Sequence, residues 1–580
     1  MNSFSARVFI FAVTSLVLMK NSLQSLAEPQ QGIAETPVDL VLTHGRIWTA
    51  DDTARWAEAV AIHGNRIVYV GSSQNLKSFI GAKTESIDLG GRLVVPGFND
   101  AHIHLVSGAL SLERVDLIEA QSLEAVQALI RDFAAANLKR PWVLGRGWLY
   151  GSFAGGLPAK EQLDAVVSDR PAYMECYDGH SGWANSNALA LAGITRETKD
   201  PENGVIVRDP KTGEPTGALK EAATALIEAK IPKPDAETRY QLFLRALQLL
   251  NSKGITSVQD AGYPSVDLQN DLLLFERAKR EGRLTLRITA AVQMNEDNYA
   301  SAIAEASRLQ KIHHDAFLRF GAMKGFVDGV IEAHTAAMLE PYSDDPAFSL
   351  GLPNWQPENL NAAVVAADKA GLQIYLHAIG DRGVRMALDA HGAALQMNGQ
   401  RDRRGRIEHI ETIAAADYPR FKNLGVIASM QPLHANPDQN NVNVWSRNAG
   451  PDRAFRGFGW GNLEKAGARL VFGSDWPVVT PEVFRGLYCA VTRKTKDGTP
   501  AHGWLPELAV SIENALRHYT IDAAYASFEE KEKGSIAVGK LADMIVLSED
   551  LFNSSSETIL QTRVLLTVMD GKIIYREDNW

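Results

Sequence analysis

The sequence of 580 residues is too long for one small core, and 45% hydrophobic with 22% charged residues is the composition of a globular protein. A net charge of -10, without a basic run or a basic patch interleaved with aromatic residues, argues against a nucleic-acid partner. Two cysteines, Cys176 and Cys489, are too few for a disulfide framework or a cysteine metal knuckle. We expect two isolated buried thiols, with a single bridge as the alternative.

The N-terminus has the pattern of a secretory signal peptide. Arg7 provides a positive flank, residues 8–19 form an apolar stretch too short to span a bilayer comfortably, and residues 25–27 offer a small-x-small cleavage site. An uncleaved membrane anchor is the alternative, which Lys20 and the short apolar run disfavour. We therefore expect residues 1–27 to be removed, and the mature protein to be periplasmic or secreted without stable membrane insertion.

Both ends of the remaining chain carry β-strand patterns. Residues 28–92 contain short strand-like runs, among them a hairpin on a Gly64-Asn65 turn. Residues 531–580 contain two more strand-like runs, the second broken by an Asp-Gly turn. Neither end has enough strands for a sandwich of its own, so we predict that the two ends pair into one composite β-sandwich.

The region between the two ends alternates strand-like runs with helical patterns, which is typical of a parallel α/β fold. Eight strand-like runs fit a closed (β/α)8 barrel, the TIM barrel. We assign its first strand to residues 93–106. The segment between the first and second predicted strands is much too long for one βα unit. We therefore predict that residues 107–235 are an insertion close to the substrate, and that residues 236–530 form the rest of the barrel. The eight runs span residues 92–96, 255–259, 286–292, 320–326, 373–377, 406–409, 426–430 and 469–473.

His102 and His104 follow the first of these runs, two residues apart. On a strand, residues i and i+2 point to the same side, about 7 Å apart at Cα. Two imidazoles at that spacing can hold one metal ion, and neutral imidazole is a usual donor to zinc. The alternative is that the pair is ordinary core or surface material.

The other predicted strands make the metal site the better interpretation. The C-terminal ends of barrel strands converge on one mouth, where active sites of this fold lie. The chain has only 14 histidines, which a chance pattern would scatter. Six metal-compatible side chains instead stand at or just past strand ends: His102, His104, Lys324, His377, His409 and Asp475.

With these motifs the chain resembles the metal-dependent amidohydrolase superfamily. Within it, the chain is similar to the YtcJ-like subgroup (amidohydrolase family 3), which includes the N-substituted formamide deformylases. The resemblance covers nearly all of the chain after residue 27. It rests on Pro96-Gly97-Phe98-x-Asp100-x-His102-x-His104, Asp178-Gly179-His180, Gly254-Ile255-Thr256-Ser257-Val258, His377-Ala378-Ile379-Gly380-Asp381-Arg382, Arg406-Ile407-Glu408-His409, Gln431-Pro432 and Gly473-Ser474-Asp475-Trp476-Pro477, among others.

The resemblance implies a site for one or two divalent ions, with zinc expected. Its ligands would be His102, His104, His377, His409 and Asp475. Lys324 stands where relatives with two ions carry a lysine carboxylated by carbon dioxide, which bridges the ions. The alternative is a lysine that binds no metal and pairs with Asp328 or Asp475.

The resemblance also implies the reaction, hydrolysis of a non-peptide C–N bond by attack of a metal-bound hydroxide. Asp475 would take the proton and pass it to the leaving amine, or else act as a ligand alone. His180 is the candidate for a substrate or oxyanion contact from the insertion, with a core histidine as the alternative. Asp381 and Arg382 would shape the pocket or form an ion pair beneath the metal.

The expected substrate is a small amide or formamide with an N-substituent. Six aromatic residues placed in rim loops or the insertion favour an aryl or alkyl group. The rival functions are deamination or hydrolysis of cyclic amides or esters on the same scaffold, and a metal-binding barrel without turnover. A homodimer is compatible with the sequence. The six aromatics are Trp148, Tyr150, Trp183, Tyr342, Trp445 and Trp476.

Overall fold

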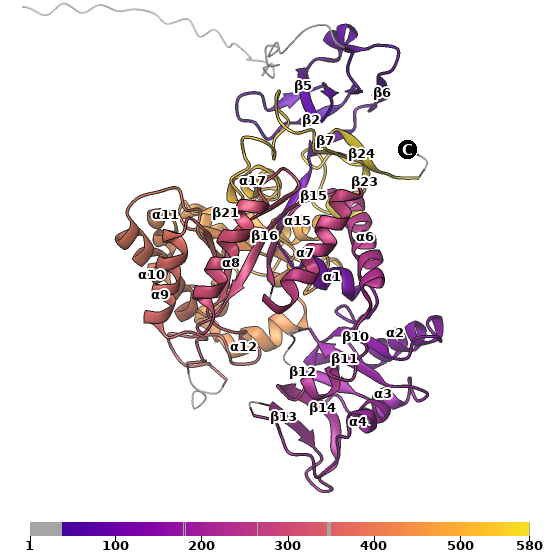
Figure 1. The fold of residues 1–580 in the computed structure, drawn as a ribbon, viewed down its shortest axis with the longest axis vertical. Helices are drawn as coiled ribbons and strands as arrows, with labels where there is room; N and C mark the ends of the chain where they lie inside the picture. The colour runs from indigo at the N-terminus through magenta and orange to yellow at the C-terminus, as the bar shows by residue number, and fades with distance from the viewer. Residues whose placement is uncertain are drawn as a thin grey trace, which may run out of the picture.

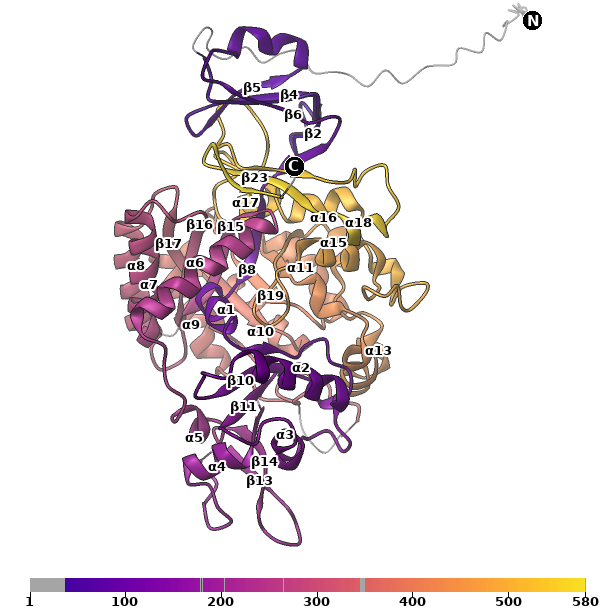
Figure 2. The same ribbon diagram turned by 90° about the vertical axis from the view of Figure 1, so that its right-hand side faces the viewer.

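The computed structural model describes residues 37–177, 179, 181–202, 204–263, 265–344, 350–578 and 580. The predicted signal peptide therefore lies outside the described residues. A barrel forms the middle of the molecule, with a β-sandwich at one end and the insertion at the other (Figures 1 and 2). Within the described part, no helix is both long and apolar enough to cross a membrane.

The predicted barrel is confirmed. Eight strands form one sheet in which every neighbouring pair runs parallel. Asp475 N, just past the last strand, donates to His102 O on the first at 2.6 Å, so the two edges of the sheet meet. In chain order the strands are β8 (Phe98–Ile103), β15 (Ile255–Tyr263), β16 (Arg287–Met294), β17 (Leu318–Phe326), β18 (Gln373–Ala378), β19 (Arg406–His409), β20 (Ile427–Met430) and β21 (Arg469–Phe472).

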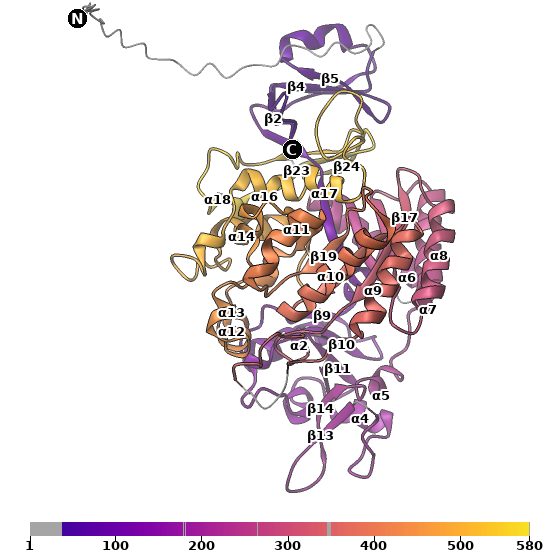
Figure 3. The ribbon, with the colours of Figure 1, turned by 90° about the vertical axis from the view of Figure 1, so that its left-hand side faces the viewer.

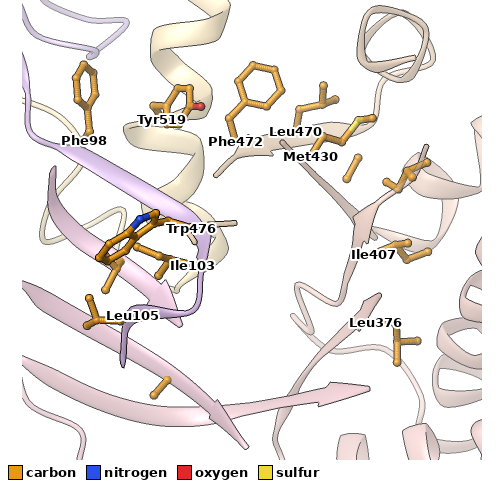
Figure 4. Close-up of a cluster of buried hydrophobic side chains, with 14 of the residues drawn as sticks. Phe98, Ile103, Leu105, Leu376, Ile407, Met430, Leu470, Phe472, Trp476 and Tyr519 are labelled. Atoms are coloured by element: carbon orange, nitrogen blue, oxygen red, sulfur yellow. The ribbon is translucent and has the colours of Figure 1, made fainter. Parts of the chain in front are cut away.

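Helices surround this sheet (Figure 3). Alternation along the strands sends apolar side chains such as Leu376 and Ile407 outward into the main core (Figure 4). The neighbouring Tyr375 and Arg406 point into the barrel, where the guanidinium stacks on the ring 3.9 Å from its centroid. The larger covering helices are α1 (Leu105–Ser111), α6 (Ala236–Ser252), α7 (Ser265–Arg280), α8 (Tyr299–Ile312), α9 (Pro357–Lys369), α10 (Asp381–Asn398), α11 (Tyr418–Leu424), α15 (Val483–Thr492), α16 (Ile512–His518) and α17 (Ile521–Ala526).

The two chain ends form one sandwich, as predicted. Its two sheets share an apolar core to which Leu42 and Val60 contribute from one sheet and Val94, Val546 and Leu566 from the other. One sheet contains β1 (Leu40–Thr43), β4 (Ala59–His63), β5 (Arg66–Gly71) and β6 (Glu85–Asp88). The other contains β2 (Arg46–Trp48), β3 (Trp56–Ala57), β7 (Leu93–Pro96), β22 (Met544–Leu547), β23 (Val564–Met569) and β24 (Lys572–Arg576).

The prediction that the barrel begins within residues 92–96 was wrong. Leu93–Pro96 is β7 of the sandwich, paired with β2 and β22. The chain changes sheets at Gly97, whose N–H donates to Asp543 O of the sandwich, whereas the next N–H, on Phe98, donates to Gly254 O of the barrel. A Cβ on Gly97 would lie 2.4 Å from the Thr256 side chain, so glycine is required at this crossing.

The insertion has a mixed six-stranded sheet and two apolar cores of its own. It begins later than predicted, because residues 105–111 form α1, which belongs to the main barrel core. Its strands are β9 (Val115–Asp116), β10 (Val143–Trp148), β11 (Ala172–Cys176), β12 (Ser181–Ala184), β13 (Gly204–Arg208) and β14 (Pro215–Glu221). Its helices are α2 (Leu123–Ala136), α3 (Lys160–Asp164), α4 (Ser186–Ala192) and α5 (Ala225–Glu228).

Candidate metal centre and substrate pocket

The six side chains predicted from strand ends meet at the barrel mouth. One ligand atom from each of His102, His409 and Asp475 lies within 4.8 Å of the others. His104 Nε2 lies 3.2 Å from Asp475 Oδ1, and the ring centroids of His377 and His409 are 4.5 Å apart. The sixth side chain, Lys324, has its Nζ 3.3 Å from His102 Nε2.

Backbone conformation brings two of these residues into the mouth. Strict alternation after Glu408, which faces the barrel interior, would turn His409 outward. A left-handed φ of 74° at His409, followed by 52° at Ile410, turns the imidazole back toward the other histidines. Asp475 also has a left-handed φ, of 59°, a conformation that aspartate tolerates better than most residues.

The loop that carries Asp475 is fastened to the first barrel strand. Ser474 donates to the Asp100 carboxylate twice, from its backbone N at 2.8 Å and from Oγ at 2.5 Å. Gly473 packs against His102, since a Cβ there would lie 2.4 Å from the His102 backbone nitrogen. The position of Asp475 is therefore set by the contacts of its neighbours Gly473 and Ser474 with the first barrel strand.

Residues behind the candidate metal ligands determine which ring nitrogen of each histidine carries the proton. His102 Nδ1 lies 2.6 Å from Glu408 Oε2 and donates to it, which leaves the Nε2 lone pair facing the mouth. Burial alone would raise the pKa of Glu408, but Arg406 and His102 hold it well below its usual value. Arg406 donates to both Glu408 oxygens at 2.8 and 2.9 Å. Sequence reasoning missed this role of Glu408, although its position in Arg406-x-Glu408 puts both side chains on one face of the strand.

His409 is oriented in the same way, because its Nδ1 lies 2.8 Å from Gln431 Oε1 and donates to it. His377 has its Nε2 3.4 Å from Gly329 O. Burial and Lys324 lower the pKa of His102 to about 4 and of His377 to about 3. Burial and His377 lower the pKa of His409 well below its usual value. These three imidazoles are therefore neutral at physiological pH.

Asp475 is ionised among them. Burial raises its pKa, but His102, His104 and His409 together hold it well below the usual value. Its Oδ1 accepts no hydrogen bond within the described part of the chain, although two imidazole nitrogens lie within 3.4 Å. Neutral imidazoles and an unpaired carboxylate oxygen converging on one point form the donor set that divalent zinc takes. The residues present therefore fit a metal ion.

Lys324 is fully buried, and burial lowers the pKa of its amine to about 8. The alternative prediction, that Lys324 forms an ion pair with Asp328 or Asp475, is wrong: among the described residues no such pair is present. Neither Asp328 nor Asp475 lies within 4.0 Å of the amine, and the Asp328 carboxylate instead accepts from the backbone N–H groups of Ala337, Ile379 and Gly380.

A cavity of about 970 Å³ opens from this centre. The barrel contributes His104, Lys324, His377, His409 and Asp475 to its lining. The insertion closes the opposite side with Ile118, Glu119, Gln121, Leu149, Tyr177 and Glu221, which supports the prediction that it lies near the substrate.

The aromatic-pocket prediction was wrong. None of the six residues named for it lines the cavity, and Trp148, Trp183 and Trp445 are fully buried packing residues. Among the described lining residues, the aromatic side chains are Tyr177 and Phe326. Asp381 and Arg382 do not line it either, and Asp381 pairs with Arg453 at 3.1 Å.

His434 is a pocket residue that sequence reasoning missed. Its ring is stacked on His409 at 5.6 Å, and its Nε2 lies 3.4 Å from Asp475 Oδ2. It lies in the short η4 helix (Pro432–Ala435), two residues after the Pro432 of the Gln431-Pro432 pair noted in the sequence. His180, the residue predicted for a substrate contact, lies outside the described residues. Both cysteines are buried and neither forms a disulfide, as expected.

Comparison with known proteins assigns this chain to a family. A model described as "Amidohydrolase family" matches residues 85–575. The Arabidopsis thaliana protein LONG AFTER FAR-RED 3 is 33% identical over 98% of this chain and 97% of its own. The putative amidohydrolase YtcJ of Bacillus subtilis is 29% identical over 92% of this chain and 98% of its own.

An enzyme and a solved structure match at similar length. The N-substituted formamide deformylase of Arthrobacter pascens is 29% identical over 93% of this chain and 98% of its own. The crystal structure of an uncharacterised metal-dependent hydrolase from Pyrococcus horikoshii superposes with a TM-score of 0.69 and 26% identity, covering 89% of this chain and 99% of that one.

Proposed function

This chain belongs to the amidohydrolase family, as a hydrolase of carbon–nitrogen bonds other than peptide bonds, and from that premise we propose that it cleaves an N-substituted amide or formamide. The observation that carries the proposal is the unpaired Oδ1 of Asp475, at the convergence of His102, His104 and His409 beside a cavity of about 970 Å³. The name of the Arthrobacter pascens relative supports the choice of substrate class.

The proposed metal is zinc, held by His102, His104, His377, His409 and Asp475. When bound, such an ion acidifies a water and polarises the carbonyl of the amide. Neutral histidines fit this task, since a protonated imidazole has no lone pair to offer. Glu408 and Gln431 support it by binding the other ring nitrogen of His102 and His409.

Asp475 is the proposed proton carrier. Its low pKa keeps the carboxylate ionised and ready to accept a proton, which it would return to the nitrogen of the leaving amine. His434 faces its second oxygen and lines the cavity, so we assign to His434 a hydrogen bond to the substrate carbonyl. The predicted contact from His180 stays a prediction.

A panel of N-formyl and N-acyl amines tests the function. Zinc-reconstituted protein should release an amine together with formate or another carboxylic acid. The rate of release should depend on which acyl group the substrate carries. Release of ammonia from an amino-substituted heterocycle, with no amide cleaved, would instead indicate a deaminase.

A further inference from the structure

The insertion turns the ends of three of its strands toward the cavity. β9, β10 and β11 are neighbouring parallel strands, so their C-terminal ends lie at the same end of the insertion sheet. The first cavity-lining residues after these strands are Ile118, Leu149 and Tyr177, one from each strand. In open α/β sheets, ligands bind outside the C-terminal ends of parallel strands. The cavity therefore lies between two sets of strand ends, those of the barrel and those of the insertion.

Four aliphatic side chains of the cavity lining form what we call the aliphatic wall: Ile118, Leu149, Val478 and Val479. The first two come from the insertion, and the two valines come from the loop after β21. None of the four side chains carries a polar atom, and Ile118 and both valines are only half-buried. Apolar side chains that stay accessible in a pocket are favourable contacts for an apolar part of a ligand.

The two halves of the aliphatic wall are each held in place. Glu119, which follows Ile118 in the chain, pairs with Arg485 of α15, the helix into which the loop after β21 leads. That loop is fastened at its other end, because His104 N donates to Trp476 O at 2.8 Å. The ion pair therefore ties the insertion half of the wall to the element that carries the two valines.

The aliphatic wall lies on the side of Asp475, the proposed proton carrier. Val478 N donates to Asp475 O at 2.7 Å, so the valines follow that residue within one turn. β21 is the eighth strand of the barrel and β17 the fourth, which places the loop after β17 across the mouth. That loop lines the cavity with a mixture of apolar and acidic side chains, among them Val330, Asp328 and Glu332. The side of Asp475 is therefore the better environment for an apolar group.

We propose that the aliphatic wall binds the substituent on the amine nitrogen of the substrate, so that the preferred substrates are amides of apolar amines. This deepens the proposed function and rests on it for the amide. Asp475 must reach the amine nitrogen to return its proton, and a group attached to that nitrogen then lies beside Val478 and Val479. Ile118 and Leu149 cover the same group from the insertion. Each methylene group that the wall buries should tighten binding about fourfold.

Binding is measured with two sulfonamides, which resist hydrolysis. N-hexylmethanesulfonamide and N-methylhexanesulfonamide are isomers that carry the same hexyl chain, on the amine nitrogen in the first and on the acyl side in the second. Calorimetric titration of the metal-loaded protein should show the amine-side isomer binding at least about tenfold more tightly, because burying about two methylene groups suffices for that difference. Isomers of equal composition remove any difference that comes from overall hydrophobicity.

Variants assign the preference to the aliphatic wall. Ile118→Ala and Leu149→Ala should each weaken binding of the amine-side isomer about fourfold, the worth of one methylene group no longer buried, and leave the acyl-side isomer unaffected. Ile118 is only half-buried, so its variant tests the wall even if Leu149→Ala does not fold. Leu138→Ala is the matched control, a truncation in the insertion at a residue that is 72% exposed and does not line the cavity. It should bind both isomers as the wild type does.

Equal binding of the two isomers by the wild type, or tighter binding of the acyl-side isomer, would overturn the proposal. So would a preference of wild-type size in both Ile118→Ala and Leu149→Ala. The function is read separately, from turnover of the isomeric amides N-hexylformamide and N-methylhexanamide. Cleavage of either amide, with equal binding of the sulfonamides, would keep the amidase and reject the wall. A binding preference without cleavage of any amide would keep the wall and reject the amidase.

Discussion

At the scale of residues, the mouth of the barrel separates two tasks. His102, His409 and Asp475 present free lone pairs, while Glu408, Gln431 and Asp100 hold them in position. Loss of such a supporting partner typically costs about tenfold to a hundredfold in metal affinity or activity. These three supporting residues are therefore part of the functional site.

Asp475→Asn tests the proton carrier. The amide keeps the shape of the carboxylate but accepts no proton, and we expect kcat to fall by about 10²–10⁴, the usual size of general acid–base catalysis. Metal content is measured alongside, since Asp475 is also a proposed ligand. Near-normal turnover would show that another group moves the proton.

Lys324 is expected to react with carbon dioxide when the metal is loaded. Its amine is uncharged above its pKa of about 8, which burial sets below the ordinary value, and only an uncharged amine adds to carbon dioxide. At equal concentrations of dissolved carbon dioxide, reconstitution of the metal-free protein with zinc should therefore be faster at pH 9 than at pH 7. Lys324→Ala should lose most activity and regain part of it in a small carboxylic acid, but not in chloride of equal strength. A crystal structure of the active, fully loaded enzyme with a bare amine would contradict this.

At the scale of elements, an ion-pair cluster joins the insertion to the barrel at the pocket rim. Glu119, four residues after the start of β9, pairs with Arg485 of α15 and with Lys496. Both partners line the cavity, so this ion-pair cluster forms part of its wall.

Glu119→Gln should loosen that wall. The pairs are partly exposed, so the free energy of unfolding should change by less than about 1 kcal/mol. We expect KM to rise severalfold with kcat little changed, and faster hydrogen exchange around β9. Glu113→Gln is the control, since Glu113 pairs with Arg140 and Arg245 outside the cavity and its loss should leave KM as it was. An unchanged KM in Glu119→Gln would show that the cluster does not shape the pocket.

The sequence was sufficient for the barrel and for all six residues at its mouth, because strand ends must converge in this fold. The prediction of the first barrel strand failed at Leu93–Pro96. There the chain passes from a strand of the sandwich into a strand of the barrel, and the sequence pattern does not separate the two. Sequence reasoning also missed Glu408 and His434. Their roles depend on partners far away in the chain, such as His102 for Glu408, and no local pattern encodes those pairs.

At the scale of the whole molecule, the sandwich and the barrel share buried charges. Arg287, the first residue of β16, donates to Asp543 of the sandwich at 2.6 and 2.9 Å, and to Asp570 at 3.0 Å. Arg287 and Asp543 are almost fully buried, so the two parts should unfold together.

Asp543→Ala should cost about 3–5 kcal/mol in the free energy of unfolding, because it leaves most of a buried guanidinium charge unpaired. Urea denaturation followed by tryptophan fluorescence measures it. Asp570→Ala should cost less, because Asp570 is more exposed and makes one of the bonds. A loss below 1 kcal/mol for Asp543→Ala would mean that the pair does not couple the two parts.

Export is proposed from the N-terminal pattern. Sequencing of the natively expressed protein should begin near Glu28. Recovery of intact Met1 in the cytoplasmic fraction would contradict the proposal.

The pairing of β7 with β22 has a consequence for biosynthesis. β7 leads directly into the first barrel strand, but its neighbour on one side lies some 450 residues further along the chain. A ribosome, or a translocation channel that passes the chain from its N-terminus, delivers β22 almost last. Until then the sandwich sheet that contains β7 has an open edge, to which strands of other chains could add. The sheet of the sandwich that contains β7 can therefore be completed only after β22 has been synthesised.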